Sequence, residues 1–346
     1  MTSITDSDGI LDPSGRISGN VLTGTSSVVA TWTSPAAFDA MAGMAYLSGL
    51  NRTDDALGRL ALANNSLARQ DGARAYVGLL GDYADFDSNG GVVGFKVQTS
   101  GFTAGFDIPL DGDILVGIDI SSTSETADVK NGGGEQEGQI LGFGLHGDMD
   151  MGDYHIGGAI TFGSGDIDYN QSVTIDGVAD IANGEYGHNR FTAGLNITKT
   201  IETSEWNFDL AGSLIYVRGK DDGFTETGVD TNSALTFGDR TYERVRAGIA
   251  ATFQQNKAQA VFNPWLSVGI YQHFDIKQSD NSYRLGSGSA VALDGREVDG
   301  FEGQLGAGFS YQLTDDIRMD IGAGVGLRED VTSARISLRF SIPLGD

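Results

Sequence analysis

From Ala73 to the C-terminus, apolar and polar residues alternate in twelve stretches, and this period of two is the feature that most constrains the fold. It is the period of a β-strand whose two faces meet different surroundings. Many stretches reach about 11 residues, longer than the usual 5–6 residues of a strand. The predicted strands are roughly residues 73–84, 91–108, 113–123, 138–150, 153–163, 188–201, 205–219, 240–255, 258–274, 300–313, 316–328 and 331–342.

The connections between these strands are alternately short and long. Every second one is short, as in PLDGD, MGD, ETSE, QNKAQ and TDD, whereas the others are mostly long and polar, as in STSETADVKNGGGEQEG. An outer-membrane barrel has short periplasmic turns, long outer loops and an even strand number. A soluble sandwich has no reason to gather its long loops at one end. We therefore predict an all-β fold, a 12-stranded antiparallel transmembrane β-barrel over residues 73–346.

Individual strands show which face would meet lipid. In the stretch 316–328, Ile317, Ile321 and Val325 share an apolar face, whereas Asp320 and Gly324 lie on the other. Apolar-out and polar-in alternation is the rule for a barrel in lipid. One such strand alone also fits an antiparallel sheet on a soluble core, but twelve long ones favour the membrane barrel.

The composition excludes several other classes. Cysteine is absent, and a net charge of −25 argues against nucleic-acid binding, which depends on basic patches. The four histidines have no metal-binding spacing, the acidic outer loops lack a calcium-loop motif, and no G-x-S-x-G elbow occurs. We expect no cofactor, no metal and no nucleic-acid partner.

The segment before the barrel favours helix. Ser34 and Pro35 form an N-cap and first-turn pair before AAFDAMAGMAYLSGL, and Thr53 is predicted to be a second N-cap, followed by acidic residues. A helix from about residue 54 to 70 would be roughly 25 Å long, about the apolar height of an outer-membrane barrel. We therefore predict an N-terminal α-helix that threads the lumen. Its polar residues are Asp54, Asp55, Arg59, Asn64, Asn65 and Arg69.

Two segments resemble the translocator domain of type V autotransporters of Gram-negative bacteria. They are GFTETGVDTNSALTFGDRTYERVRAGIAATF (223–253) and NPWLSVGIYQHF (263–274). The matching positions are Asp222, Gly223, Phe224, Thr225, Glu226, Gly228, Arg244, Arg246, Gly248, Pro264, Trp265, Gly269, Tyr271 and His273. The resemblance covers about residues 54–342. It implies an outer-membrane domain that takes part in moving its own N-terminal passenger to the cell surface, without enzymatic turnover.

The resemblance also implies partners and an organisation. The implied partners are outer-membrane lipid and lipopolysaccharide, the barrel assembly machinery and periplasmic chaperones, and we expect a monomer. We divide the chain into a residual passenger or linker (1–33), a helical linker with the pore helix (34–72) and the barrel (73–346). No signal peptide is visible at MTSITDSDGI, and only about fifty residues precede the helix, so we expect a fragment or a processed form.

Such domains usually end on an aromatic residue that serves as the insertion signal. Phe340 takes this place in ARISLRF, but SIPLGD follows it. Either the last strand continues to Ile342 or a tail follows the signal.

Three rival functions stay open at this stage. A stand-alone porin or channel would show high conductance and no plug. An outer-membrane hydrolase could use His273 beside Asp275 at the outer rim. A soluble β adhesin would purify without detergent.

Self-cleavage is a further alternative for the helix. In one autotransporter subgroup an Asn-Asn pair in the lumen is cleaved by cyclisation, and Asn64-Asn65 resembles that pair. A nearby carboxylate is needed, and Asp209 or Glu302 could supply it from the luminal face. The simpler interpretation is a polar helix face against a wet pore.

The predicted site also includes charged residues and glycines at strand positions that should face the lumen. The charges could grip the helix or only solvate the lumen; they are Asp209, Arg244, Arg246, Glu302, Arg318, Asp320, Arg335 and Arg339. Glycine inside a strand often marks close approach by another backbone. We therefore predict that the helix rests on a glycine patch formed by Gly306, Gly308, Gly322, Gly324 and Gly326.

Overall fold

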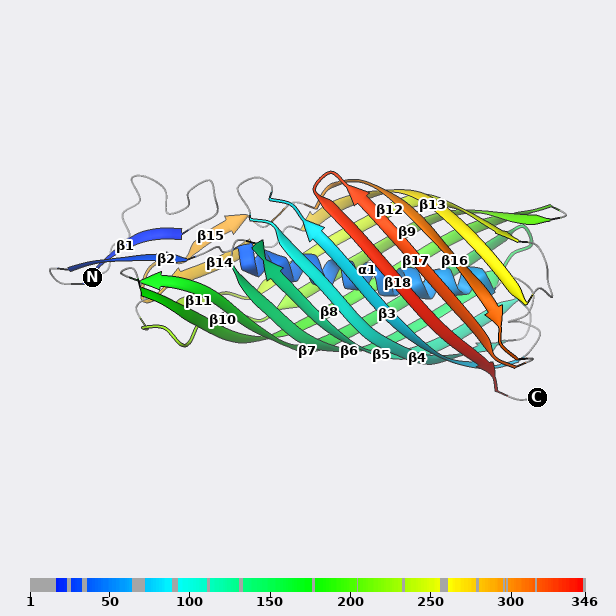
Figure 1. The fold of residues 1–346 in the computed structure, drawn as a ribbon, viewed down its shortest axis with the longest axis horizontal. Helices are drawn as coiled ribbons and strands as arrows, with labels where there is room; N and C mark the ends of the chain where they lie inside the picture. Colours follow the sequence, from blue (N-terminus) through cyan, green and yellow to red (C-terminus); the bar gives the residue numbers. More distant parts are fainter. Residues whose placement is uncertain are drawn as a thin grey trace.

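The computed structural model describes residues 17–23, 26–32, 36–63, 72–88, 93–110, 113–130, 133–175, 178–203, 205–231, 234–255, 261–277, 280–294, 296, 298–314 and 316–344. Twelve antiparallel strands close into a barrel around one helix (Figure 1). The barrel strands are β3 (Arg74–Phe86), β4 (Phe95–Pro109), β5 (Ile114–Val129), β6 (Gly134–Asp150), β7 (Tyr154–Ile175), β8 (Val178–Glu202), β9 (Trp206–Asp221), β12 (Arg240–Gln255), β13 (Phe262–Lys277), β16 (Gly300–Gln312), β17 (Arg318–Arg328) and β18 (Val331–Pro343). The predicted fold class and the strand number are confirmed.

The last strand closes the barrel against the first. Phe340 of β18 pairs with Val77 of β3, and the ladder continues to Pro343, which pairs with Arg74. The strand therefore passes three residues beyond the predicted insertion signal. Of the two expectations for the C-terminus, the extended strand is the correct one.

Several segments predicted as outer loops are in fact strand. β5 continues to Val129, and the predicted loop between Ser164 and Gly187 is the upper part of β7 and β8. β8 has 25 residues. At ~3.3 Å per residue and a tilt of about 45°, it rises roughly 58 Å, about twice the ~25 Å apolar band of a barrel. The prediction failed because an apolar outward face marks only the part of a strand that meets lipid, and the strands continue into water with polar outward residues.

Along β7, the two faces exchange polarity. Odd-numbered residues point inward throughout. The outward residues change from apolar to polar, and are Ile156, Ile160 and Phe162, then Ser164, Asp166, Asp168, Asn170, Ser172 and Thr174. The inward residues change the other way, from His155 and Thr161 to Ile167, Tyr169 and Val173. The wall is thus apolar outside at one end and apolar inside at the other.

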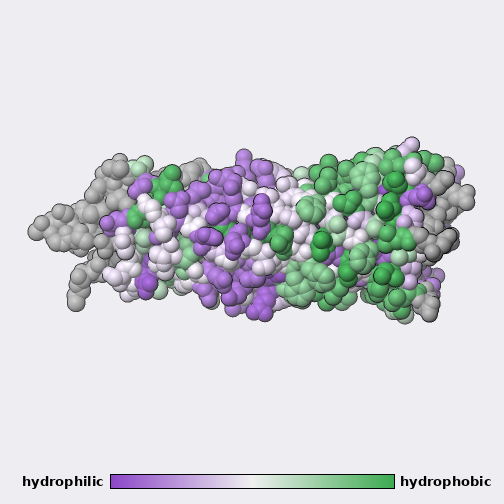
Figure 2. Space-filling model, turned by 90° about the horizontal axis from the view of Figure 1, so that it is seen from below, coloured by the Kyte–Doolittle hydropathy of each residue, from purple (hydrophilic) through white to green (hydrophobic). Residues whose placement is uncertain are grey.

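The exchange occurs at one level on neighbouring strands. Phe162 pairs with Phe143 of β6 and with Phe191 of β8, and all three point outward as the last aromatic residues below polar positions. Figure 2 shows the result on one face, with a hydrophobic half toward the short turns and a hydrophilic half beyond it. We take this level as the outer edge of the membrane, where aromatic residues form a belt.

The helix α1 (Ala36–Ala63) runs along the barrel axis (Figure 1). Its C-terminal end connects to β3 at the end that carries the short turns and the chain's C-terminus, so the helix begins at the outer end. Within the described ranges, no helix is both long and apolar enough to cross a membrane.

The two described strands before the helix lie at the outer end. β1 (Ile17–Thr23) and β2 (Ser26–Trp32) form a hairpin, and β2 pairs with the tip of β7, where Trp32 lies opposite Val173. β7 extends past the end of β6, and this leaves an edge to which a strand can be added.

A second, small sheet covers the outer mouth. It consists of β10 (Phe224–Thr225), β11 (Leu235–Phe237), β14 (Asp280–Leu285) and β15 (Val291–Asp294). Phe224 stacks on Tyr186 at a ring separation of 5.1 Å and on Phe237 at 4.7 Å. These rings join the inward apolar side chains of the extended strands in one core.

The polarity exchange predicts position-dependent effects of charge on one strand. Leu195 lies in the middle of the outward apolar band of β8, and Glu185 points outward above it. Leu195→Arg should destabilise the folded barrel by about 2–4 kcal/mol, as expected for arginine at mid-membrane. Glu185→Arg, the control, should change the free energy of unfolding by less than about 0.5 kcal/mol. Urea unfolding in lipid vesicles measures both, and equal effects would contradict the assigned membrane edge.

Candidate functional site in the barrel lumen

The luminal helix is one continuous element and not the two predicted. Thr53, predicted as an N-cap, lies inside α1 and is fully buried. The buried part spans Ala40 to Leu57, so the luminal segment begins well before the predicted residue 54. The N-cap prediction was wrong because no helix begins at Thr53. Thr53, Asp54 and Asp55 lie inside the helix, and their side chains contact the barrel wall. Ser34, Pro35, Asn64, Asn65 and Arg69 lie outside the described residues, as does the side chain of Arg59.

The helix lies against the wall formed by β4 to β9, and small residues permit the close approach. A Cβ atom on Gly49 would lie 3.0 Å from Thr192 and 3.1 Å from Arg190. A Cβ atom on Gly194 of β8 would touch Thr53, and one on Gly142 of β6 would overlap Arg52 of the helix. Glycine therefore seats the helix, but at positions other than the predicted patch.

The predicted glycine patch faces the lumen but does not hold the helix. The nearest atoms to Gly308 and Gly322 include the indole of Trp265, and those nearest to Gly324 belong to Arg335. Trp265 lies opposite Gly308 on the neighbouring strand and covers the space that the missing side chains leave. The prediction of a helix seat is corrected accordingly, because a large side chain of the wall occupies the place foreseen for a backbone. The remaining two glycines, Gly306 and Gly326, meet Ser267 and Glu302.

Ion pairs hold the helix from both sides. Asp54 contacts Arg246 of β12 and, at 3.4 Å, Arg335 of β18. Asp55 pairs with Arg339 of β18 at 2.6 Å. These contacts come from the side where the helix backbone is far from the wall, so long arginine side chains bridge the distance.

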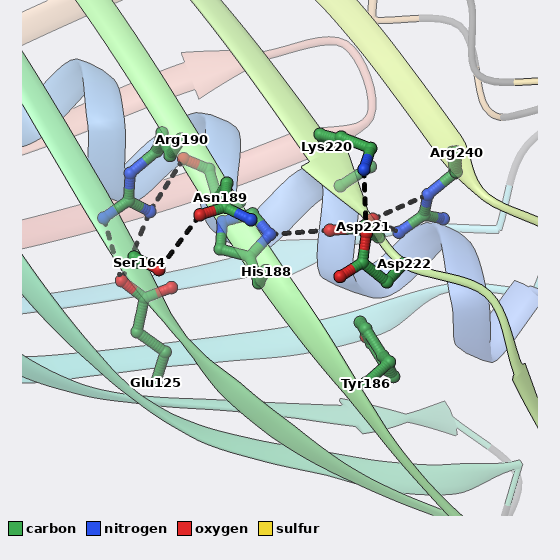
Figure 3. Close-up of polar contacts among 12 residues, drawn as sticks. Glu125, Ser164, Tyr186, His188, Asn189, Arg190, Lys220, Asp221, Asp222 and Arg240 are labelled. Carbon is green, nitrogen blue, oxygen red and sulfur yellow. Dashed lines mark hydrogen bonds and ion pairs between the residues drawn. The ribbon is translucent and has the colours of Figure 1, made fainter.

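The opposite side of the helix is bound through its own arginine and a serine. Arg52 pairs with Asp119 of β5 at 2.8 Å. Ser48 donates a hydrogen bond of 2.7 Å to Glu125, a fully buried carboxylate that also pairs with Arg190 at 3.3 Å (Figure 3). The Arg190 guanidinium also donates to the Ala45 carbonyl of the helix at 3.1 Å.

Hydrogen bonds complete the ring of contacts. The Tyr46 hydroxyl meets His273 Nδ1 at 2.8 Å, and His273 Nε2 lies 2.5 Å from Glu302. Arg244 donates to the Ala42 carbonyl of the helix at 3.2 Å. Both ring nitrogens of His273 are thus engaged inside the barrel, so His273 is not the exposed base at the outer rim that the hydrolase alternative assigned to it.

Of the eight predicted luminal charges, five are linked to the helix. Arg244, Arg246, Arg335 and Arg339 do so directly, and Glu302 does so through His273. The remaining three are engaged with the wall. Asp320 pairs with Arg318 at 3.0 Å, and Asp209 accepts hydrogen bonds from Thr200 and Gln254 at 2.6 Å each.

Two cavities lie between the helix and the described part of the wall. A cavity of about 140 Å³ lies between the helix and the wall, where Asp54, Trp265 and Gly322 line it, and one of about 60 Å³ lies beside Leu50 and Gly324. Both gaps are large enough to hold water molecules.

The outer mouth carries a buried polar cluster of its own. Glu226, directly after β10, is buried, contacts Gln171 of β7 and accepts a hydrogen bond of 2.9 Å from the Leu235 amide. Burial raises the pKa of Glu226 to about 7. His188, Asp221 and Arg240 form a second buried cluster where the extended strands begin (Figure 3).

Sequence reasoning missed most of the helix side of this site. Tyr46, Ser48 and Arg52 belong to a stretch predicted only as a linker, and their wall partners Asp119 and Glu125 were not singled out. The alternation along the strand could have identified them, because Asp119 and Glu125 both occupy inward positions of a regular strand.

A model of the family described as "Autotransporter beta-domain" matches residues 75–324. Among solved structures, the translocator domain of autotransporter NalP from Neisseria meningitidis is similar, with a TM-score of 0.68 and 13% identity over 87% of this chain and 97% of that one. The β domain of the Bordetella autotransporter BrkA has a TM-score of 0.59 and 15% identity, over 79% of this chain and 100% of that one. Among curated proteins, no sequence match was found.

The arginine contacts predict which variants loosen the helix. Arg246→Gln combined with Arg339→Gln removes partners of Asp54 and Asp55, and loss of one member of a buried pair costs on the order of 3 kcal/mol. We expect a higher open conductance in planar bilayers. The control is Arg318→Gln, whose acidic partner lies in the wall. Conductance that is unchanged in the double variant, or raised equally in the control, would show that these arginines do not hold the helix.

Proposed function

The chain belongs to the autotransporter β-domain family and is an outer-membrane translocator domain, and we propose that its luminal helix is the end of an exported N-terminal segment, held in the pore after export. The family implies an attached passenger domain. We assign residues 1–33 to the passenger or its linker, 34–72 to the linker with the pore helix, and 73–346 to the barrel.

The direction of the helix carries this proposal. Its C-terminal end leads to β3 at the end with the short turns, so the chain before Ala36 leaves the lumen at the outer end. The hairpin β1–β2 lies there, paired with the tip of β7. A chain that reaches the outside through the lumen and remains attached to the barrel has this arrangement.

The contacts around the helix support a role for it as a plug after export. The two cavities described beside it, about 140 and 60 Å³, are small, which favours passage of the upstream segment before the helix is seated. Contacts from β5, β8, β12 and β18 then hold the helix. An open porin would lack these contacts.

The partners proposed for this barrel follow from the family. Insertion would require the barrel assembly machinery and periplasmic chaperones, with β18 and Phe340 as the insertion signal. Outer-membrane lipid and lipopolysaccharide would surround the apolar band in Figure 2.

A second proposal is that the helix is cleaved in the lumen by its own asparagine. Asn64-Asn65, the predicted pair, lies outside the described residues. Within them, Asn51 Nδ2 donates a hydrogen bond of 2.8 Å to Asp82 of β3. If Asp82 accepted the amide proton, Nδ2 could attack the Asn51 carbonyl carbon. The Asn51–Arg52 bond would then break as Asp82 passes this proton to the departing nitrogen, leaving a succinimide on Asn51 and a free amine on Arg52.

The direction of export is tested with epitope tags on the complete precursor. A tag before residue 17 should bind antibody on intact cells, because this end of the chain is proposed to lie outside. A tag after Asp346 should bind only after permeabilisation, since the C-terminus lies at the periplasmic end. An N-terminal tag that stays inaccessible until the cells are permeabilised would contradict the proposal.

Self-cleavage is tested by intact mass measurement of the barrel isolated from membranes. Cleavage at the described contact gives a fragment that begins at Arg52, and cleavage at the predicted pair gives one that begins at Asn65. Asp82→Asn should abolish the first product and leave the second. A barrel that retains the whole helix in every preparation would exclude both reactions.

A further inference from the structure

A groove crosses the outside of the barrel at the membrane edge. It spans β6 to β9, has a volume of about 570 Å³ and is open to the surroundings. On β6 and β7 it is bounded by Leu141, Phe143 and Phe162, which are exposed apolar side chains of the band. Above them Ser164 of β7 and Asn189 of β8 line it, joined by a hydrogen bond of 2.9 Å (Figure 3). One depression therefore contains both an apolar and a polar part.

The polar part carries two cations. Arg218 and Lys220 occupy the first two outward positions of β9 above Tyr216, and their side chains are 55% and 49% exposed. Register places Arg218 opposite Phe191 and Lys220 opposite Asn189, so the cations stand directly beside the aromatic belt.

The basic pair differs from the other strands at the same level. The first polar outward residues of β4 to β8 and β12 are Ser100, Ser122, Gln139, Ser164, Asn189 and Glu243. The whole chain has 22 basic against 47 acidic residues and a net charge of −25. Arg218 and Lys220 are therefore two adjacent exposed cations at the membrane edge of an otherwise acidic chain.

The acidic partners of these cations leave them available. Glu243 lies on the β12 side of Arg218, away from the groove, at 3.9 Å, where an exposed pair contributes little. Lys220 pairs with Asp222 at 2.9 Å, but both side chains are about half exposed, so the contact can be exchanged for another anion. Guanidinium and ammonium groups bind phosphate by charge-assisted hydrogen bonds.

We propose that this groove binds a phosphorylated glycolipid of the outer leaflet, with its phosphate on Arg218 and Lys220 and an acyl chain along Phe143 and Phe162. The inference rests on the proposal above that lipopolysaccharide is a partner of this barrel, and it names the place of contact. The charge of Arg218 and Lys220 and the position of the groove in the membrane both favour this occupant. The cations and the aromatic rings meet at the level where the headgroup region begins.

The barrel purified in detergent is titrated with diphosphoryl lipid A, and bound lipid is counted by native mass spectrometry. Arg218→Gln with Lys220→Gln should weaken binding by about tenfold or more, since two charge-assisted contacts are lost. Arg218→Lys with Lys220→Arg keeps both charges and should bind nearly as well as the unchanged barrel. The matched control is Lys96→Gln, an exposed outward lysine on β4 outside the groove. A difference in gel mobility between heated and unheated samples shows that each variant is folded.

Dephosphorylated lipid A should bind the unchanged barrel as weakly as lipid A binds the double glutamine variant. Equal binding by the double variant, an equal loss in Lys96→Gln, or displacement of lipid A by the same concentration of phosphatidylglycerol would each overturn the proposal. The assay needs no passenger, so it can fail while surface display of the N-terminal tag succeeds, and the reverse.

Discussion

The pairing of buried charge between helix and barrel is the interaction on which the luminal structure depends. The wall presents arginines at Arg190, Arg246 and Arg339, and acids at Asp119 and Glu125, all facing inward. A buried ion without a partner is costly, so the lumen needs counter-charges. The helix supplies an arginine and two aspartates, together with backbone carbonyls, and the wall pairs its other charges internally. Helix and wall therefore complete each other, and a barrel without the helix would need water in its place.

The membrane imposes the second constraint, and it acts on the strands from outside. Below the edge marked by Phe162, lipid requires apolar outward residues and the helix requires polar inward ones. Above the edge the requirement reverses, because water lies outside and the small sheet must bury its aromatic rings inside. One uninterrupted strand such as β8 serves both environments. The same edge also brings the apolar and basic residues of the outer groove together.

Much of the barrel could be predicted from sequence, because period two and the alternation of loop lengths depend on local patterns. The membrane crossings, the strand number and the inward parity of Arg246 and Arg339 follow from these patterns. The contacts across the lumen do not, since Asp55 and Arg339 are far apart in sequence and meet only once the barrel closes. The glycine patch shows the same limit: parity placed Gly322 in the lumen, but Trp265 on another strand decided what fills the space.

The most direct test of the account is a disulfide between helix and wall, in a chain that has no cysteine of its own. Gly49→Cys with Thr192→Cys places two thiols where a Cβ on Gly49 lies 3.0 Å from the Thr192 side chain, within reach of a disulfide. Oxidation in native outer membranes should block thiol labelling in this variant, and reduction should restore it. Gly49→Cys with Gly324→Cys should remain labelled. A bridge in the second variant and none in the first would place the helix on the glycine patch and contradict the account.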